Sequence, residues 1–316
     1  VNNSSDTKNA VKDIKFFDPD IRTYAIPDWE TLPYDRFSPH KNIVSERIRI
    51  LNELATIRRG IVVVTAGTLL HRIAPRYWLT DKSFKIAPGK IFQRKNLIER
   101  LQGLGYSERR QVNEYGEMAI RGSIVDIFAT GEINPARIDF FDDLVESIRS
   151  FSPEDQRSLD RRQNLTILPA REFPLDSDAI GRFKKNWRLE FGSKSVTSAI
   201  YEDISSAMPP AGVEYYLPFF FAKMSLINDY LPTGSIFAFD QQIAENIEQL
   251  NGRFSDRFRN LREVGERPIL KPTDILADLE ELHENLGENR KIFLAASMQD
   301  VPQSNESSVL FRTKNS

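Results

Sequence analysis

The sequence contains no cysteine among its 316 residues. Disulfide bonds, thiolate nucleophiles and cysteine-ligated zinc are therefore excluded, and the composition suits a reducing compartment. No apolar run approaches the ~20 residues that cross a bilayer, and the first residues do not form a secretory signal. We therefore expect a cytoplasmic protein with no membrane partner. Because the chain begins with Val1, we also expect a fragment of a longer protein.

An excess of basic charge is also lacking, since the chain has 43 Lys and Arg residues and 45 Asp and Glu residues. Proteins that bind the phosphate backbone normally carry net positive charge, so this balance disfavours a damaged-DNA binding module. The basic doublets have acids nearby or lie at the ends of expected elements, which is typical of a solvated face: Arg58-Arg59, Arg109-Arg110 and Arg161-Arg162. The run Phe219-Phe220-Phe221 is able to stack bases, but it is more typical of a hydrophobic core.

No pattern for nucleotide or metal binding is present in the sequence. The Gly-x-x-x-x-Gly-Lys-Ser/Thr loop is missing, and its nearest approach, Ala66-Gly67-Thr68, is typical of an ordinary strand-to-helix turn. The three histidines, His40, His71 and His283, form no ligand pair, so we expect surface or capping positions for them. The acidic pair Asp142-Asp143 is typical of a turn. The sequence therefore predicts no cofactor, no metal and no catalytic residue.

The first part of the chain has the pattern of an α/β layer. A short strand is expected at residues 23–26. Apolar residues then recur at helical spacing from Ile43 to Leu54, after Ser38-Pro39 as the predicted N-cap and first helical residue. Arg59-Gly60 ends this helix, and Ile61 to Val64 is predicted to be a strand buried on both faces, followed by a helix at residues 68–73. This order resembles one half of a nucleotide-binding motor fold.

From about residue 82 the pattern changes to that of an antiparallel meander on a helix. A turn at Pro88-Gly89-Lys90 and a helix at residues 94–104 precede strands at residues 118–128, 137–141 and 144–151. After Leu168-Pro169 helical spacing returns at residues 176–191 and 241–261, with a buried strand expected at 235–239. We predict four parts: residues 1–82 and 169–300 as two halves of one α/β domain, 83–168 as an inserted α+β domain with an antiparallel sheet, and 301–316 as a tail.

The strand at residues 137–141 carries the most specific signal, because side chains on a strand alternate between its faces. Ile138 and Phe140 share one face, whereas Arg137 and Phe141 share the other. If the apolar pair faces the core, Phe141 is exposed beside Arg137, and Arg121 on the preceding strand lies near both. Arginine and aromatic residues together are typical of binding hot spots. The alternative, that Phe141 packs beneath the turn as a satellite core residue, fits the pattern equally well.

Several motifs resemble those of the bacterial transcription-repair coupling factor (Mfd) family, and one of them is shared with UvrB. They are DWETLPYD at residues 28–35, FSPH at 37–40, the shared GEMAIRGSIVDIF at 116–128, RIDFFDD at 137–143, LPAREFP at 168–174 and PPAGVEYY at 209–216. The resemblance extends from about residue 6 to about residue 294.

This resemblance implies a degenerate RecA/helicase-like domain interrupted by the domain that contacts UvrA in UvrB and in the coupling factors. Position by position, Arg121, Arg137 and Phe141 match the family's UvrA-contacting residues. The implied function is that of a non-catalytic UvrB-homology module that recruits UvrA for transcription-coupled nucleotide excision repair. In the full-length family, RNA polymerase and DNA are contacted through domains absent from this sequence, which include the ATP-dependent translocase.

The main alternative is a subdomain of an ATP-dependent helicase or UvrB-type protein that contacts damaged DNA. It requires a phosphate loop upstream of Val1, and UvrB itself has a tyrosine-rich hairpin for which we find no counterpart. Compared with the family, the chain is expected to begin after the first strand and the degenerate phosphate-loop helix, and to end before the polymerase-binding and translocase domains.

Overall fold

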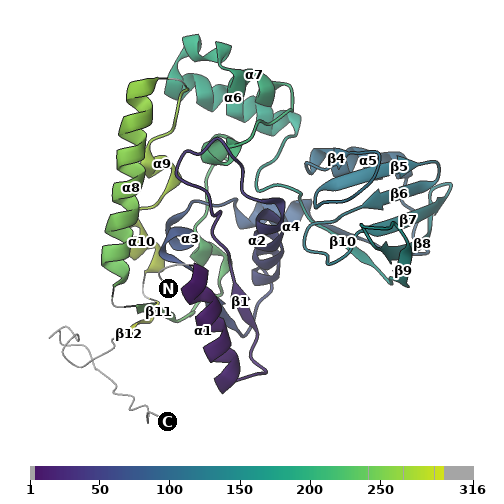
Figure 1. Cartoon of the computed structure of the whole chain (residues 1–316), viewed down its shortest axis with the longest axis horizontal. Helices are drawn as coiled ribbons and strands as arrows, with labels where there is room; N and C mark the ends of the chain where they lie inside the picture. The colour runs from purple at the N-terminus through teal and green to yellow at the C-terminus, as the bar shows by residue number, and fades with distance from the viewer. Residues whose placement is uncertain (1–3, 241, 266, 288, 295–316) are drawn as a thin grey trace.

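The computed structural model describes residues 4–240, 242–265, 267–287 and 289–294 (Figure 1). The predicted tail at residues 301–316 lies outside the described residues. The larger body, to the left in Figure 1, is mostly helical, and a six-stranded sheet projects from it on the right. None of the described helices is long and apolar enough to cross a membrane.

The larger body combines two stretches of the chain that flank the sheet. The first stretch contains α1 (Ser4–Phe17), β1 (Thr23–Ala25), α2 (Lys41–Leu54), β2 (Ile61–Val63), α3 (Ala66–Leu70) and α4 (Arg76–Lys82). The second contains α6 (Ser177–Phe191), α7 (Ala199–Ser205), β11 (Phe237–Asp240), α8 (Ile243–Val264), α9 (Pro272–Ile275), α10 (Leu279–Leu286) and β12 (Lys291–Leu294), with 3-10 turns η1 (Ser193–Thr197), η2 (Val213–Phe219) and η3 (Ile227–Tyr230). Buried residues between 24 and 79 and between 168 and 286 form one hydrophobic cluster.

Aromatic rings fill much of this cluster. Phe219, Phe220 and Phe221 are all buried, as predicted for core residues. The ring of Phe183 on α6 packs against both Phe219 and Phe220, and Trp187 packs one turn further along the same helix. Contacts of this kind fasten α6 to the η2 turn, so these rings are unavailable to stack nucleic-acid bases.

The start of α2 differs from the prediction. The N-cap residue is His40, whose Nδ1 accepts a hydrogen bond from the backbone N of Asn42 at 3.3 Å, and not Ser38. Ser38 has another partner: its hydroxyl donates to Glu214 Oε2 at 2.8 Å and accepts from the backbone N of Gly212 at 3.1 Å. Ser38 thus connects the segment before α2 to the distant segment at Gly212 and Glu214. The helix begins at Lys41, two residues later than predicted.

The strands of the larger body are shorter and less buried than predicted. In the described part of the chain they form two separate two-stranded parallel sheets, β1 with β2 and β11 with β12. In β2 only Val63 is buried, so the prediction of a strand buried on both faces is wrong. The expected buried strand at 235–239 is β11, which is mostly half-buried. Among the described residues each of these strands pairs with a single neighbouring strand. Helix α1 was not predicted at all.

The inserted sheet has the expected antiparallel meander. This region of the chain contains β3 (Phe84–Ile86), α5 (Arg94–Gly103), β4 (Ser107–Glu108), β5 (Glu117–Arg121), β6 (Ile124–Ile127), β7 (Ala136–Phe141), β8 (Leu144–Phe151), β9 (Ser158–Arg161) and β10 (Leu165–Ile167). β3 and β10 pair with each other in a separate two-stranded antiparallel sheet, and the other strands form the six-stranded sheet. The strand order is β4-β5-β6-β7-β8-β9, and every pair is antiparallel except β4 with β5. The predicted single strand at 118–128 is in fact β5 and β6, because Gly122 has a φ of +57° and turns the chain.

The two faces of this sheet have different environments. One face packs on α5 with buried residues that include Leu97, Leu101 and Ile138. The other face has a small cluster of Val112, Ala119, Phe128 and Phe151, and we call it the open face because Arg121 and Phe141 are exposed on it. The candidate site lies on this open face.

Candidate partner-binding face of the six-stranded sheet

The alternation of side chains on β7 places Phe141 in solvent. Ile138 and Phe140 are buried in the α5 face of the sheet, whereas Phe141 is 68% exposed. The predicted parity is confirmed, and the alternative of a satellite core residue is wrong. Packing within the chain does not explain a phenylalanine this exposed on a strand, and such residues often mark binding surfaces.

A buried carboxylate orients the two predicted arginines. Asp126 on β6 is fully buried, and its oxygens accept hydrogen bonds from Arg137 Nε at 2.8 Å, from Arg137 Nη2 at 3.0 Å and from Arg121 Nη2. These hydrogen bonds raise the pKa of the Arg137 guanidinium, which stays charged. The guanidinium also lies over the Phe151 ring, 4.8 Å from its centre. The two arginines are therefore held in fixed positions while their outer edges face solvent.

Asp126 was not identified from the sequence. The sequence did contain an indication of its role, because a single acid in the apolar strand IVDIF is unfavourable to bury unless it has a hydrogen-bonding or ionic partner. Its partners were unknown because they depend on the pairing of β6 with β7, where Asp126 lies directly opposite Arg137.

Exposed apolar residues extend the face beyond Phe141. Phe141 pairs with Leu144 across the β7–β8 turn, and Ile91 forms an isolated antiparallel bridge with Leu144. Residues paired in this way point to the same side of a sheet. Ile91 is 80% exposed and Leu144 is 38% exposed. We call Phe141, Leu144 and Ile91 the apolar row. The predicted turn at Asp142-Asp143 is confirmed, and it is the tip of this hairpin.

Comparisons with known proteins assign this region. Residues 84–173 match the UvrB interaction domain family. The chain is 36% identical over 262 residues to the transcription-repair-coupling factor of Escherichia coli (strain K12), a match that covers 83% of this chain and 23% of that protein. The corresponding protein of Haemophilus influenzae is 36% identical over 261 residues, or 82% of this chain and 23% of its own length. That of Bacillus subtilis is 27% identical over 239 residues, or 70% and 20%.

The chain belongs to the transcription-repair-coupling factor family. It spans about a quarter of the length of the curated relatives it matches. The matched UvrB interaction domain contains the whole six-stranded sheet, so Arg121, Arg137, Phe141 and the rest of the open face all lie within it.

Elsewhere in this coupling-factor segment, the turn that most resembles a phosphate loop contains an acid. Thr65 caps α3, and its hydroxyl donates to Asp28 Oδ1 at 2.6 Å, while the hydroxyl of Thr68 donates to the same oxygen. The predicted strand-to-helix turn is confirmed. The carboxylate of Asp28 therefore lies beside this turn, where its negative charge would disfavour a bound phosphate.

The histidines of the segment have structural positions. His40 caps α2 and His283 is exposed, as predicted. His71 is the C-cap residue of α3, as predicted for a capping position, and its ring also packs between Trp29 at 4.8 Å and Phe254 at 5.8 Å. Burial lowers its pKa to about 4. In the described residues no group of three His, Cys, Asp or Glu side chains is arranged to hold a metal.

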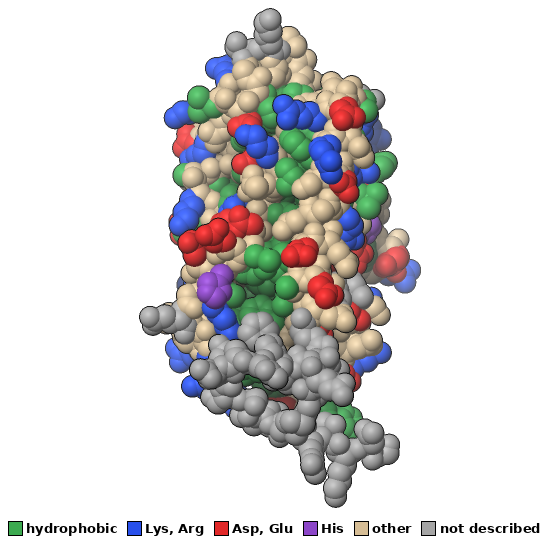
Figure 2. All heavy atoms as spheres, turned by 90° about the vertical axis from the view of Figure 1, so that its left-hand side faces the viewer, with side chains coloured by type: hydrophobic (Ala, Val, Ile, Leu, Met, Phe, Trp, Pro, Cys, Tyr) green, Lys and Arg blue, Asp and Glu red, His purple; other side chains and the backbone are tan. Residues whose placement is uncertain are grey.

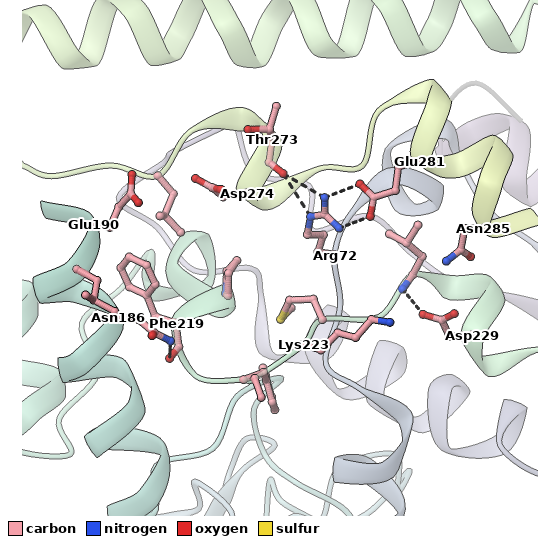
Figure 3. Close-up of a pocket in the computed structure, with 17 residues that line it drawn as sticks. Arg72, Asn186, Glu190, Phe219, Lys223, Asp229, Thr273, Asp274, Glu281 and Asn285 are labelled. Atoms are coloured by element: carbon pink, nitrogen blue, oxygen red, sulfur yellow. Dashed lines mark hydrogen bonds and ion pairs between the residues drawn. The ribbon is translucent and has the colours of Figure 1, made fainter.

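A charged hollow lies in the larger body, between α6, the segment after η2, α9 and α10 (Figure 3). Some of the charged side chains that line it have ionic partners: Arg72 binds Glu281, also in the lining, through two hydrogen bonds of 2.5 and 2.6 Å, and Glu190 lies 3.7 Å from Lys271 outside it. Burial, followed by the charge of Glu190, raises the pKa of Asp274. The residues lining it do not combine a nucleophile with a base, so the hollow does not suggest a reaction.

The face of the molecule that carries α8 also shows no signature of nucleic-acid binding. Figure 2 shows hydrophobic side chains gathered along the middle of this face, with acidic and basic side chains interspersed on both sides. The described residues visible there form no continuous basic stripe of the kind that follows a phosphate backbone.

Proposed function

We propose that this chain is a non-catalytic UvrB-like module that recruits UvrA for transcription-coupled nucleotide excision repair. The observation that carries the proposal is an exposed Phe141 on the same face as the half-exposed Arg121 and the mostly buried Arg137, both held by a buried carboxylate, within a domain that matches the UvrB interaction domain family. An exposed aromatic anchor beside oriented arginines is typical of interface hot spots. On this proposal Phe141 enters an apolar pocket of UvrA, while Arg121 and Arg137 pair with acidic groups.

We further propose that the larger body is a degenerate RecA/helicase-like domain without nucleotide binding, interrupted by the UvrA-binding domain at about residues 83–168. Two separate hydrophobic clusters support this division. One is formed by residues that precede and follow the inserted sheet in the sequence, and the other lies within residues 86–167. The strand-turn-helix of β2 and α3 supports the motor-like origin, and Asp28 in that turn supports its degeneration. On this proposal the chain acts in the cytoplasm, and contacts to RNA polymerase and DNA belong to other parts of the full-length relatives.

The experiment is a calorimetric titration of UvrA into the chain and into Arg121→Ala and Arg137→Ala. We expect a saturable complex with the unmodified chain and a loss of tenfold or more in affinity for each variant, because truncation of a hot-spot arginine typically costs ~2 kcal/mol. Arg253→Ala, an exposed arginine on α8, is the matched control and should bind normally.

Two results would count against the proposal. Equal affinity for all four proteins would remove the predicted face from the interface. Salt-sensitive binding of duplex DNA by the chain, with no binding of UvrA, would favour the alternative of a subdomain that contacts damaged DNA.

A further inference from the structure

Three arginines stand in a single row across the open face of the sheet. Arg137 on β7 lies directly opposite Arg149 on β8, and Arg149 lies directly opposite Arg161 on β9. The backbone N of Arg162 donates to the carbonyl of Ile148 at 2.8 Å and so fixes the second pair. Like charges directly opposite one another destabilise a sheet, so such a row requires a compensating anion. We call Arg137, Arg149 and Arg161 the arginine row.

Only one member of the row has a carboxylate partner among the described residues. Asp126 binds Arg137 and is already shared with Arg121. Arg149 is partly buried, and its Nε is buried with no hydrogen-bond partner in the described part of the chain. Arg161 is exposed. The row therefore presents unmatched positive charge toward the β9 edge of the sheet.

Neighbouring arginines outside the row are neutralised within the chain. Arg162, which points to the opposite side of β9 from Arg161, binds Glu132 at 2.6 Å, and Arg157 lies 3.6 Å from Asp155. Arg149 and Arg161 thus differ from these two neighbours, whose charges are matched within the chain.

We propose that Arg149 and Arg161 bind an acidic segment of UvrA, so that the interface extends from the apolar row across β8 and β9 to the sheet edge. This inference rests on the proposed function. Arg137 and Phe141 are four residues apart on β7, which places the two rows about 13 Å from each other, and the arginine row itself spans about 10 Å. The partner must then present an apolar pocket and, about 13 Å away, a line of carboxylates.

A protein surface fits this face better than a nucleic acid does. The apolar row offers no partner to phosphates, and the acids Asp139, Asp142 and Asp143 lie between or beside the two rows. A continuous phosphate backbone would be repelled by these acids, whereas individual carboxylates of a folded partner can reach single arginines.

The test is the affinity of UvrA for Arg161→Glu and Arg149→Gln in the full chain, measured by titration at low and moderate salt. We expect a tenfold or greater loss for Arg161→Glu and a severalfold loss for Arg149→Gln, with a weaker dependence on salt in both. Arg253→Glu makes the same charge change as Arg161→Glu on α8 and should leave affinity unchanged. Because Arg161 is exposed, its variant remains informative even if Arg149→Gln impairs folding.

Phe141→Ala in the same series separates the two proposals. If Phe141→Ala weakens binding while both row variants bind normally, the arginine row lies outside the interface and this inference alone is wrong. If Phe141→Ala also binds normally, the proposed function is wrong. If Arg161→Glu abolishes binding of a duplex DNA probe and leaves UvrA affinity intact, the row binds phosphates and the assignment to UvrA is overturned.

Discussion

Replacing Glu172 with glutamine should lower the free energy of unfolding by about 3–5 kcal/mol, because the change leaves a buried arginine without its counter-ion. Glu172 Oε1 accepts a hydrogen bond from Arg47 Nε at 2.6 Å, and both side chains are almost fully buried, with exposures of 3% and 2%. Trp29 Nε1 donates to the same oxygen at 3.2 Å. Arg47 also donates to the carbonyl of Pro27 at 2.7 Å. One carboxylate thus joins chain segments on the two sides of the inserted sheet.

The size of the effect follows from this burial. An ion pair at the surface contributes about 0–1 kcal/mol, but a charge left alone in the interior cannot recover its hydration. A loss of 3–5 kcal/mol is a large part of the ~5–15 kcal/mol that stabilises a typical domain. At roughly 2–4 °C per kcal/mol for a domain of this size, the thermal midpoint of Glu172→Gln should fall by about 6–20 °C.

Urea unfolding followed by circular dichroism measures the change, and Glu53→Gln is the matched control. Glu53 pairs with Arg49 on the solvent side of α2, so its replacement should cost less than about 1 kcal/mol. A second test replaces both partners, Arg47→Met with Glu172→Leu, and should recover much of the loss. If Glu172→Gln costs no more than Glu53→Gln, the buried pair does not stabilise the larger body and the reasoning fails.

Three further predictions concern the larger body. The pKa of His71 is lowered from 6.5 to about 4, so its neutral form favours the folded state fully above pH 6.5. The free energy of unfolding should then fall by about 3 kcal/mol as the pH decreases from 6.5 toward 4. His71→Gln should remove this part of the pH dependence of urea unfolding. Gly212→Ala should lower the free energy of unfolding by at least ~2 kcal/mol, because Gly212 has a φ of +79° and a Cβ there would lie 2.6 Å from the carbonyl O of Asp35. Gly181→Ala, on the solvent-exposed side of helix α6, should be neutral or stabilising in the same assay. Calorimetric titration with Mg-ATP should give no saturable binding, and micromolar binding would contradict the role assigned to Asp28.

Local patterns predicted the parts of the fold that depend on local physics. The period of two on residues 137–141 placed Phe141 outside and Phe140 inside, and helical spacing located α2, α5, α6 and α8 to within a few residues. The inserted sheet was found for the same reason, apart from the turn at Gly122 that divides β5 from β6.

What the sequence did not reveal depends on partners that are distant along the chain. Asp126 and the arginine row follow from strand pairing, and Ser38 is diverted from α2 by Glu214, which is 176 residues away. The capping position of His71 was predicted, but the packing of its ring against Trp29 and Phe254 was not, because both partners are distant along the chain. Such contacts have no periodicity for a single sequence to display.

The affinity of UvrA for Phe141→Ala, measured beside Phe140→Ala together with the thermal midpoint of each, tests the central claim most directly. Phe141 is exposed and Phe140 is buried, so the two adjacent changes should act on different properties. We predict that Phe141→Ala loses ~2 kcal/mol or more of binding free energy, about thirtyfold in affinity, with a nearly unchanged midpoint. Phe140→Ala should lose ~3–5 kcal/mol of stability. Normal binding of UvrA by a folded Phe141→Ala variant would contradict the account.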